Sequence, residues 1–286
     1  MMKPLFGPGG NSDEFKTVCK STLEAPRWVK EYGLDAYEYE AGRGVVGSEA
    51  MFAKLGENAR EYGVKMSIHA PYFISLSSLE AEKRTGSAKY ILDSAKALRS
   101  MGFMDGTIVI HAGSCAKLER DFATRLACDA LAHAIGELQS EGLYGYSLGI
   151  ETMGKVNQLG TLDEVIELCH VDKTVVPVVD FGHMNARERG GVFQTADDYM
   201  RVFDTIADKV SSFAAMHLHC HFSKIEYTAG GEKRHLTFED ETFGPDPMPL
   251  MTAIKELGVA PTIICESDGT QARDARIMKK QYEALL

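Results

Sequence analysis

Several features that define other classes of protein are missing from this chain of 286 residues. It contains no apolar run of about 18 residues, so we expect no membrane span. Its first residues, MMKPLFGPGG, do not combine a charged segment with a following apolar one, so we expect no signal peptide. Its six cysteines form no CxxC pair, which argues against a disulfide framework and predicts free thiols in a cytoplasmic protein.

Positive charge is also scarce. The chain has 31 Lys and Arg residues against 41 Asp and Glu residues, and its formal net charge is −10. This balance argues weakly against a nucleic-acid partner, because phosphate binding usually needs a basic surface. The apolar fraction of 44% and the charged fraction of 25% place the chain among ordinary globular proteins.

The chain lacks low-complexity segments and linkers rich in Pro, Gly or Ser, and short apolar runs alternate with longer amphipathic stretches. We expect strands at residues 4–6, 36–40, 65–69, 107–111, 147–151, 175–180, 214–221 and 262–266. We expect helices at residues 21–32, 48–62, 80–100, 118–139, 162–169, 195–208, 248–257 and 271–285. Eight such units predict a (β/α)8 TIM barrel that forms one domain over residues 1–286. A doubly wound sheet is less favoured, since FGPGGN after the first strand matches neither GxGxxG nor a Walker loop.

A metal-type ligand or a carboxylate stands at the end of most of these apolar runs. The series comprises SIHAPY (His69), IVIHAG (His111), SLGIET (Glu151), VVPVVDFGH (Asp180 and His183), AAMHLHCH (His217, His219 and His221) and TIICES (Glu266), with DAYEYEAG (Glu38 and Glu40) as a weaker member. Barrels of this kind carry their active sites at the carboxyl ends of the strands, so these side chains should converge on one mouth. So many carboxylates and imidazoles in a water-poor site are costly unless divalent metal ions neutralise them. The series therefore predicts a metal cluster, whose charge would offset the acidic surface at that mouth.

Some candidates keep two interpretations. His217, His219 and His221 alternate along one expected strand and would share a face, but they cannot all lie at the same depth. The last of them can orient a ligand or contact the substrate instead of binding a metal ion. Tyr72 and Phe73, which follow the third strand, either pack locally or provide a platform for a nucleotide.

Two further candidates lie in expected loops. Arg43, after the second strand, either binds phosphate or is solvated surface. His235 lies in a long polar stretch, residues 217–240, and its spacing alone leaves open whether it is a metal ligand or a solvated side chain.

Taken in order, the motifs HAPYF, IHAGS, GIET, DFGH, a His-rich run into SK, KRH and CES resemble the endonuclease IV family. This family is the DNA-repair branch of the xylose isomerase-like TIM barrels, and the resemblance covers essentially the whole chain. It implies an enzyme that uses zinc, two or three ions per chain, to hydrolyse DNA 5′ to an abasic site. Damaged DNA would then be the partner.

The resemblance also implies roles for individual residues. One zinc ion would take His69 and His111, with Glu151 bridging to a second ion; the second would take Asp180, His219 and Glu266; the third would take His183 and His235. His219 is preferred to His217 because it lies nearer the expected mouth. Glu151 or Glu266 would position or deprotonate the attacking water. The substrate-binding candidates are Tyr72, Phe73, Arg43 and His221.

One position departs from the family pattern. The third zinc ion of the family takes a carboxylate two residues before the loop histidine, and here that position is Lys233, with Glu232 beside it. The departure favours an alternative, a sugar isomerase or epimerase that acts on a small sugar or sugar phosphate with one Mn²⁺ or Mg²⁺ ion. Such an enzyme needs only Glu151, Asp180, Glu266 and a histidine of the seventh strand, and two facing glutamates can move a proton between carbons. A metal-binding barrel without catalysis is the third interpretation.

Overall fold

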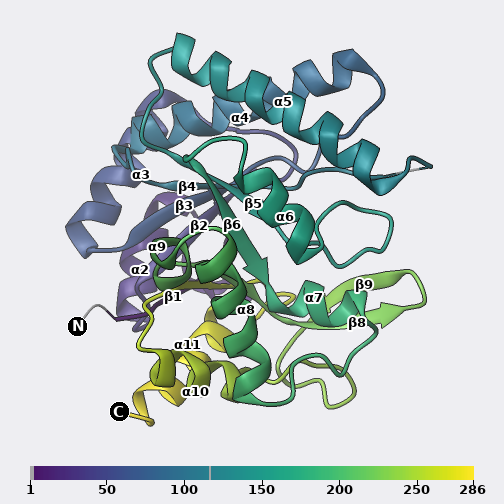
Figure 1. Ribbon diagram of the computed structural model, residues 1–286. Helices are drawn as coiled ribbons and strands as arrows, with labels where there is room; N and C mark the ends of the chain where they lie inside the picture. Colours follow the sequence, from purple (N-terminus) through teal and green to yellow (C-terminus); the bar gives the residue numbers. More distant parts are fainter. Residues whose placement is uncertain (1–2, 116) are drawn as a thin grey trace.

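The computed structural model describes residues 3–115 and 117–286. Eight parallel strands form one sheet in the order β1-β10-β7-β6-β5-β4-β3-β2. They are β1 (Leu5–Pro8), β2 (Ala36–Glu40), β3 (Lys65–His69), β4 (Thr107–Ile110), β5 (Ser147–Glu151), β6 (Val175–Asp180), β7 (His219–Phe222) and β10 (Thr262–Cys265). The strands lie at the centre of the molecule and alternate with helices (Figure 1), so the predicted (β/α)8 TIM barrel is confirmed.

The first and second strands close the barrel. Gly9, just after β1, forms a parallel bridge with Glu38 of β2. Below this bridge the two backbones approach so closely that a Cβ at Gly7 would overlap the carbonyl oxygen of Ala36. Glycine is therefore required at position 7 to let the strands meet.

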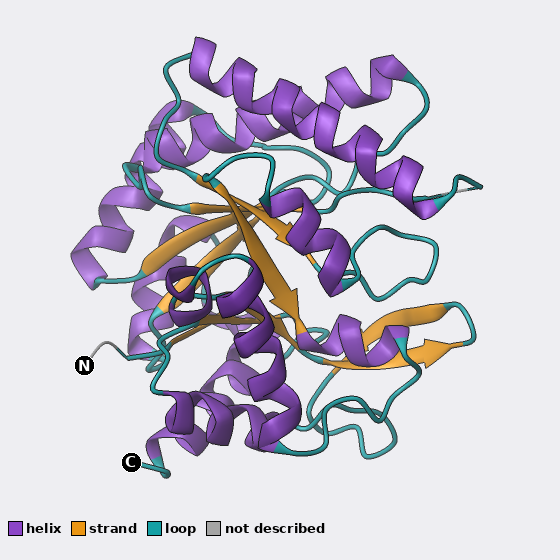
Figure 2. Cartoon of the chain, viewed as in Figure 1, coloured by secondary structure: helices purple, strands orange, loops and turns teal. Residues whose placement is uncertain are grey.

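Helices cover the outside of the sheet (Figure 2). The main ones are α2 (Ala25–Glu31), α3 (Glu49–Tyr62), α4 (Ala81–Met101), α5 (Arg120–Ser140), α6 (Leu162–Cys169), α8 (Ala196–Lys209), α10 (Pro247–Leu257) and α11 (Gln271–Glu283). Their apolar sides pack with the strands into one core, so the strands are buried on both faces, as parallel strands between helices are. Within the described residues, no helix is long and apolar enough to cross a membrane.

Local sequence signals set several helix ends. The Thr161 hydroxyl accepts a hydrogen bond from the amide of Glu164 at the start of α6, and the Glu164 carboxylate accepts one from the amide of Thr161. Gly63 and Gly102 end α3 and α4 in the left-handed conformation. These signals explain why the helices lie close to their expected positions.

The structure adds shorter elements that the sequence did not predict. They are α1 (Asp13–Val18), α7 (Phe181–Arg187), α9 (Ser212–Met216) and an antiparallel hairpin of β8 (Lys224–Thr228) and β9 (Gly231–Leu236), while the helix expected at residues 21–32 begins as a 3-10 turn (Thr22–Glu24) and continues as α2. The hairpin is formed by the polar stretch after the seventh strand, and it packs against α7 (Figure 1). It extends the barrel on the side where β6 and β7 end.

The expected seventh strand, residues 214–221, is wrong in its first half. The side chain of Ser211 caps α9, and this helix takes up the apolar run that was assigned to a strand. His217 ends the helix and packs its ring against Phe213, with 4.6 Å between the ring centres. The strand begins at His219, so His217 does not share a face with the other two histidines.

Candidate metal centre

Glu151, the last residue of β5, lies at the centre of the site and is fully buried. Its Oε2 lies 2.8 Å from His111 Nε2 and 3.4 Å from His69 Nε2. Its Oε1 lies 2.9 Å from His221 Nδ1 and 3.4 Å from His183 Nδ1. The structure therefore brings four imidazoles from different parts of the chain around one carboxylate.

The ring of His69 is fixed by the backbone. Its Nδ1 lies 2.9 Å from the carbonyl oxygen of Ala70, which can only accept a hydrogen bond, so Nδ1 carries a proton. The other nitrogen, Nε2, then faces Glu151. A backbone carbonyl on one ring nitrogen is the usual support for a histidine whose other nitrogen binds a metal ion.

Strand register decides which histidine of β7 reaches this centre. His221 lies opposite Asp180 at the end of β6, whereas His219 lies two residues deeper in the barrel. His219 Nε2 is 2.9 Å from Glu38 Oε2, while His221 Nδ1 is 3.2 Å from Glu266 Oε1. The expectation that His219 meets the other ligands at the mouth is corrected: His221 occupies that position.

Glu38 forms a deeper layer behind His221. Its Oε1 lies 2.8 Å from His221 Nε2, and its Oε2 accepts a hydrogen bond from Ser67 Oγ over 2.7 Å. The carboxylate is fully buried and lies between the rings of His219 and His221. It therefore orients His221 from the side that faces away from the cluster. The sequence analysis treated the motif that carries Glu38 and Glu40 as the weaker member of the series.

Asp180 supplies a carboxylate oxygen that has no donor. Its Oδ1 accepts a hydrogen bond from the amide of His183 over 2.6 Å and so caps α7. Its Oδ2 is buried and accepts no hydrogen bond from any described residue. An unsatisfied buried carboxylate oxygen is unfavourable, and a bound cation is a partner that removes this cost. The donor set therefore fits a divalent metal ion.

His183 and His235 face each other on the outer side of the site. His183 Nδ1 is held by the carbonyl of Thr152 at 3.0 Å, and His235 Nδ1 lies 2.9 Å from Ser223 Oγ. Their Nε2 atoms are 3.3 Å apart, and Glu232 Oε2 lies 3.5 Å from His183 Nε2. Two imidazole nitrogens this close need a proton or a metal ion between them. The negative charge of the nearby Glu232 carboxylate favours a metal ion in this position.

A β-bulge determines which hairpin residue joins this outer group. The register of β8 and β9 shifts next to Glu226, which leaves Lys233 as the extra residue on β9. Lys233 points outward, with its Nζ 2.6 Å from Glu226 Oε1. Glu232 and His235, three residues apart, both face inward. The bulge thus compensates for the lysine that breaks the sequence pattern.

Burial shifts the pKa of each ionisable group in the site toward its uncharged form, and the charges and hydrogen bonds of neighbouring groups oppose or add to that shift. Burial lowers the pKa of His69, but its hydrogen bond to Glu151 and the nearby carboxylates raise it to about 10. Burial raises the pKa of Glu151, yet the charge of His221 and hydrogen bonds from other imidazoles hold it well below its usual value. Burial raises the pKa of Glu266. The charge of His221 opposes this rise and the charge of Glu151 adds to it, so that the pKa is about 8. Positive charge is therefore favoured at the centre of the cluster.

The candidate ligands fall into overlapping groups whose atoms lie within 4.8 Å of one another. They include His69, His111 and Glu151; Glu151, Asp180, His183 and Glu266; His183, His235 and Glu266; His69, His221 and Glu266; and Glu38, His219 and His221. Glu151 and Glu266 each belong to more than one of these groups, as carboxylates do where they bridge metal ions, whereas the deep group that contains Glu38 shares only His221. Imidazole with carboxylate suits zinc as well as manganese.

A cavity of about 390 Å³ opens over the cluster. Tyr72 lines its rim and is 51% exposed. Phe73 lies outside the lining, where its ring packs on Tyr72 with 4.5 Å between centres. Arg43 is exposed and also lies outside the lining. Lys155 and Gln158 do line the cavity, and no sequence signal pointed to them because they lie in a loop without a recognisable motif.

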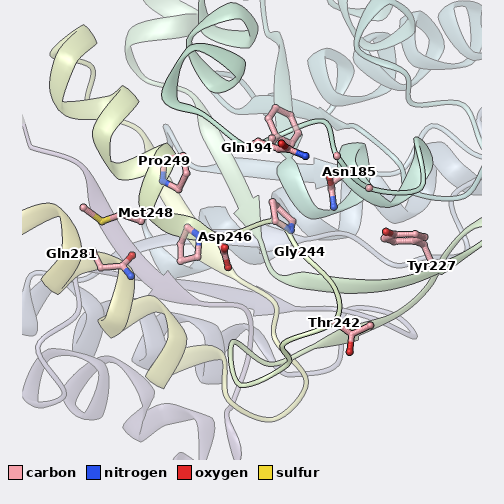
Figure 3. Close-up of a pocket in the computed structure, with 14 residues that line it drawn as sticks. Asn185, Gln194, Tyr227, Thr242, Gly244, Asp246, Met248, Pro249 and Gln281 are labelled. Carbon is pink, nitrogen blue, oxygen red and sulfur yellow. The ribbon is translucent and has the colours of Figure 1, made fainter.

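A second cavity, of about 560 Å³, lies away from the cluster (Figure 3). It is lined by residues of α7, β8 and the segment that leads into α10, among them Asn185, Tyr227 and Asp246. None of the candidate metal ligands belongs to its lining. The residues with metal and acid–base chemistry are therefore gathered at the smaller cavity.

Comparisons with known sequences agree with the fold. The sequence model described as xylose isomerase-like TIM barrel matches residues 26–285. An uncharacterized protein of Methanocaldococcus jannaschii is 30% identical over 287 residues, which cover 98% of this chain and 97% of the relative. A probable endonuclease 4 of Acholeplasma laidlawii is 27% identical over 154 residues, 51% of each chain.

Solved structures with the same fold include both nucleases and sugar epimerases. Endonuclease IV from Thermus thermophilus aligns with a TM-score of 0.67 at 17% identity, covering 98% of this chain and 100% of that one. A D-tagatose 3-epimerase-like protein aligns with a TM-score of 0.68 at 19% identity, covering 98% and 97%. At these identities the similarity establishes the fold, and the function must be argued from the site.

Proposed function

This chain belongs to the xylose isomerase-like TIM barrel family, and we propose that it is a zinc-dependent phosphodiesterase that hydrolyses DNA 5′ to abasic sites. Enzymes with this fold include nucleases and epimerases, so the arrangement of ligands has to distinguish them. The partial match to a probable endonuclease 4 supports the nuclease.

The observation that carries the proposal is the presence of ligands on both sides of a central set. The central tetrad consists of Glu151, Asp180, His221 and Glu266, the inner pair of His69 and His111, and the outer group of His183, His235 and Glu232. The central tetrad alone suffices for an enzyme with one metal ion. The inner pair and the outer group provide further positions, which a phosphodiesterase with several metal ions uses and a one-metal epimerase does not.

The different burial of Glu266 and Glu151 suggests different roles for these two carboxylates. Zinc ions held by these groups would activate water and neutralise charge on the phosphate. The Glu266 side chain is 16% exposed and faces the cavity, whereas Glu151 is fully buried among imidazoles. The exposure of Glu266 to the cavity supports a role in orienting the attacking water and accepting its proton, and the burial of Glu151 supports a role in holding the histidine rings. Tyr72 on the rim can pack against a nucleotide.

A strand-cleavage assay tests the proposal. Zinc-loaded protein should cut a duplex with one abasic site on the 5′ side of the lesion and leave an undamaged duplex intact. His111→Ala should reduce cleavage by about 100-fold or more, because it removes half of the inner pair. His133→Ala, on the exposed side of α5, is the matched control and should cut at the wild-type rate. Wild-type cleavage by a folded His111→Ala protein would refute the proposal.

A second candidate is a divalent-metal epimerase or isomerase that acts on a small sugar. It is favoured by the central tetrad, in which Glu151 and Glu266 both approach His221, within 2.9 Å and 3.2 Å of its Nδ1. One carboxylate can remove a proton from a substrate carbon while the other returns a proton, either to the opposite face of the same carbon (epimerisation) or to the neighbouring carbon (isomerisation). Epimerisation of a ketohexose by the manganese-loaded protein, together with absence of strand cleavage, would favour this candidate.

A further inference from the structure

The loop between β5 and α6 covers one side of the cavity above the cluster. Lys155 and Gln158 of this loop line the same cavity as His183 and Glu232. The loop touches the outer group directly, because a Cβ at Gly154 would lie within 3.2 Å of both His183 and Glu232. Side chains that extend from this loop are therefore within reach of a molecule bound at the cluster.

Two guanidinium groups hold the backbone of the loop. Arg187 Nη1 donates a hydrogen bond to the carbonyl of Lys155 over 2.8 Å, and Arg120 Nη2 donates to the carbonyl of Gln158 over 2.9 Å. Arg120 is itself fixed by Glu164, with Nε 2.6 Å from Oε1. Charge-assisted bonds to successive carbonyls keep the loop in one conformation.

The hairpin of β8 and β9 fixes the same loop from the other side. The amide of Glu232 donates to the carbonyl of Gly154 over 3.0 Å, and Lys155 forms an antiparallel bridge with Gly231. Gly231 has φ 86° and approaches so closely that a Cβ there would overlap the carbonyl oxygen of Gly154. The backbone of Lys155 is thus held in a fixed position relative to the outer group. This lowers the entropic cost of binding a ligand through the Lys155 side chain.

Both side chains lack a partner in the part of the chain that the structure describes. The ammonium group of Lys155 makes no ion pair or hydrogen bond with residues 3–115 or 117–286, and the side chain is exposed. The Oε1 of Gln158 is buried without a donor. Among the described residues that line this cavity, Lys155 is the only Lys or Arg. It does not neutralise a neighbouring carboxylate, so it is available to a ligand.

We propose that Lys155, together with Gln158, forms a phosphate-binding subsite at the rim of the metal centre. An unpaired ammonium recognises an oxyanion, and the adjacent amide can donate to a second oxygen of the same group. The inference rests on the proposed function in taking a phosphate ester as the substrate. The subsite would make the enzyme prefer anionic substrates to neutral sugars, and it acts by binding, since it lies beside the reacting centre.

The subsite can be tested with two probes, inorganic phosphate and an abasic duplex. In zinc-loaded protein, Lys155→Ala should weaken binding of inorganic phosphate, measured by titration calorimetry, by about 10-fold. It should also raise KM for the duplex with little change in kcat, and lower the slope of log(kcat/KM) against log salt by about 1. Lys233→Ala is the control, because this lysine points away from the cavity and pairs with Glu226; it should change none of these quantities.

The outcomes separate the subsite from the proposed function. Equal phosphate affinity in wild type and Lys155→Ala, or an equal loss in Lys233→Ala, would overturn the subsite. Failure of the wild-type protein to cut abasic DNA would overturn the proposed function, while the phosphate titration would still decide on the subsite. Lys155→Arg, which keeps the charge, should restore binding to within about 3-fold of wild type.

Discussion

At the scale of residues, the site is defined by ligand atoms that are held in fixed positions. Asp180 Oδ2 is buried without a donor, and the Nε2 atoms of His183 and His235 face each other at 3.3 Å. Each of these atoms is held in place by a contact on the opposite side of its own group, such as the hydrogen bond from the amide of His183 to Asp180 Oδ1. They are preorganised to bind a cation.

The hairpin offers a prediction about the outer group. Glu232→Ala should remove about one bound metal ion per chain, or weaken its binding by about 10- to 100-fold, because it deletes the carboxylate beside His183 and His235. Elemental analysis after dialysis against metal-free buffer measures the loss. Lys233→Ala is the neighbouring control and should keep the wild-type content, since this side chain points outward. Loss of metal in Lys233→Ala but not in Glu232→Ala would contradict the assignment.

At the scale of elements, the position of the site depends on two irregularities in otherwise regular β-structure. The bulge at Lys233 turns Glu232 and His235 to the same side of β9. The close approach of β1 and β2 at Gly7 closes the barrel below the cluster, and places Glu38 behind His221. Neither feature is a local property of the sequence, because each depends on a partner strand.

The closure of the barrel can be tested through stability. Gly7→Ala should lower the free energy of unfolding by about 1–3 kcal/mol, because the added methyl group overlaps the carbonyl of Ala36. Urea denaturation measures the change. Gly136→Ala is the control: this glycine lies within α5 with open space around it, and the change should raise stability by about 0.5–1 kcal/mol. An unchanged midpoint for Gly7→Ala would show that the strands can separate without cost.

Sequence patterns predicted the strands and helices better than the depth of individual side chains in the barrel. Alternating apolar and amphipathic segments were enough for eight strands and eight helices, because each pattern is local. The run that ends in His217 is short and apolar, so periodicity could not distinguish a helix from a strand there. Which of His219 and His221 lies level with the other ligands could not be predicted, since this is set by pairing with β6 and β10, which are distant in sequence.

At the scale of the whole molecule, the barrel gathers residues from nearly every strand at one mouth, but the fold does not decide what they do. Nucleases and sugar epimerases share this scaffold. The central tetrad fits either activity. The inner pair and the outer group, on opposite sides of the tetrad, are the features that favour several metal ions and a phosphodiester substrate.

The number of metal ions bound per chain is the most direct test of the proposal that the site holds several metal ions. Protein purified without added metal, or reconstituted with zinc and dialysed, would be analysed for all divalent metals by mass spectrometry. We expect two or three zinc ions per chain, because the inner pair and the outer group add to the central tetrad. A folded protein that binds one exchangeable manganese ion and no zinc would contradict it.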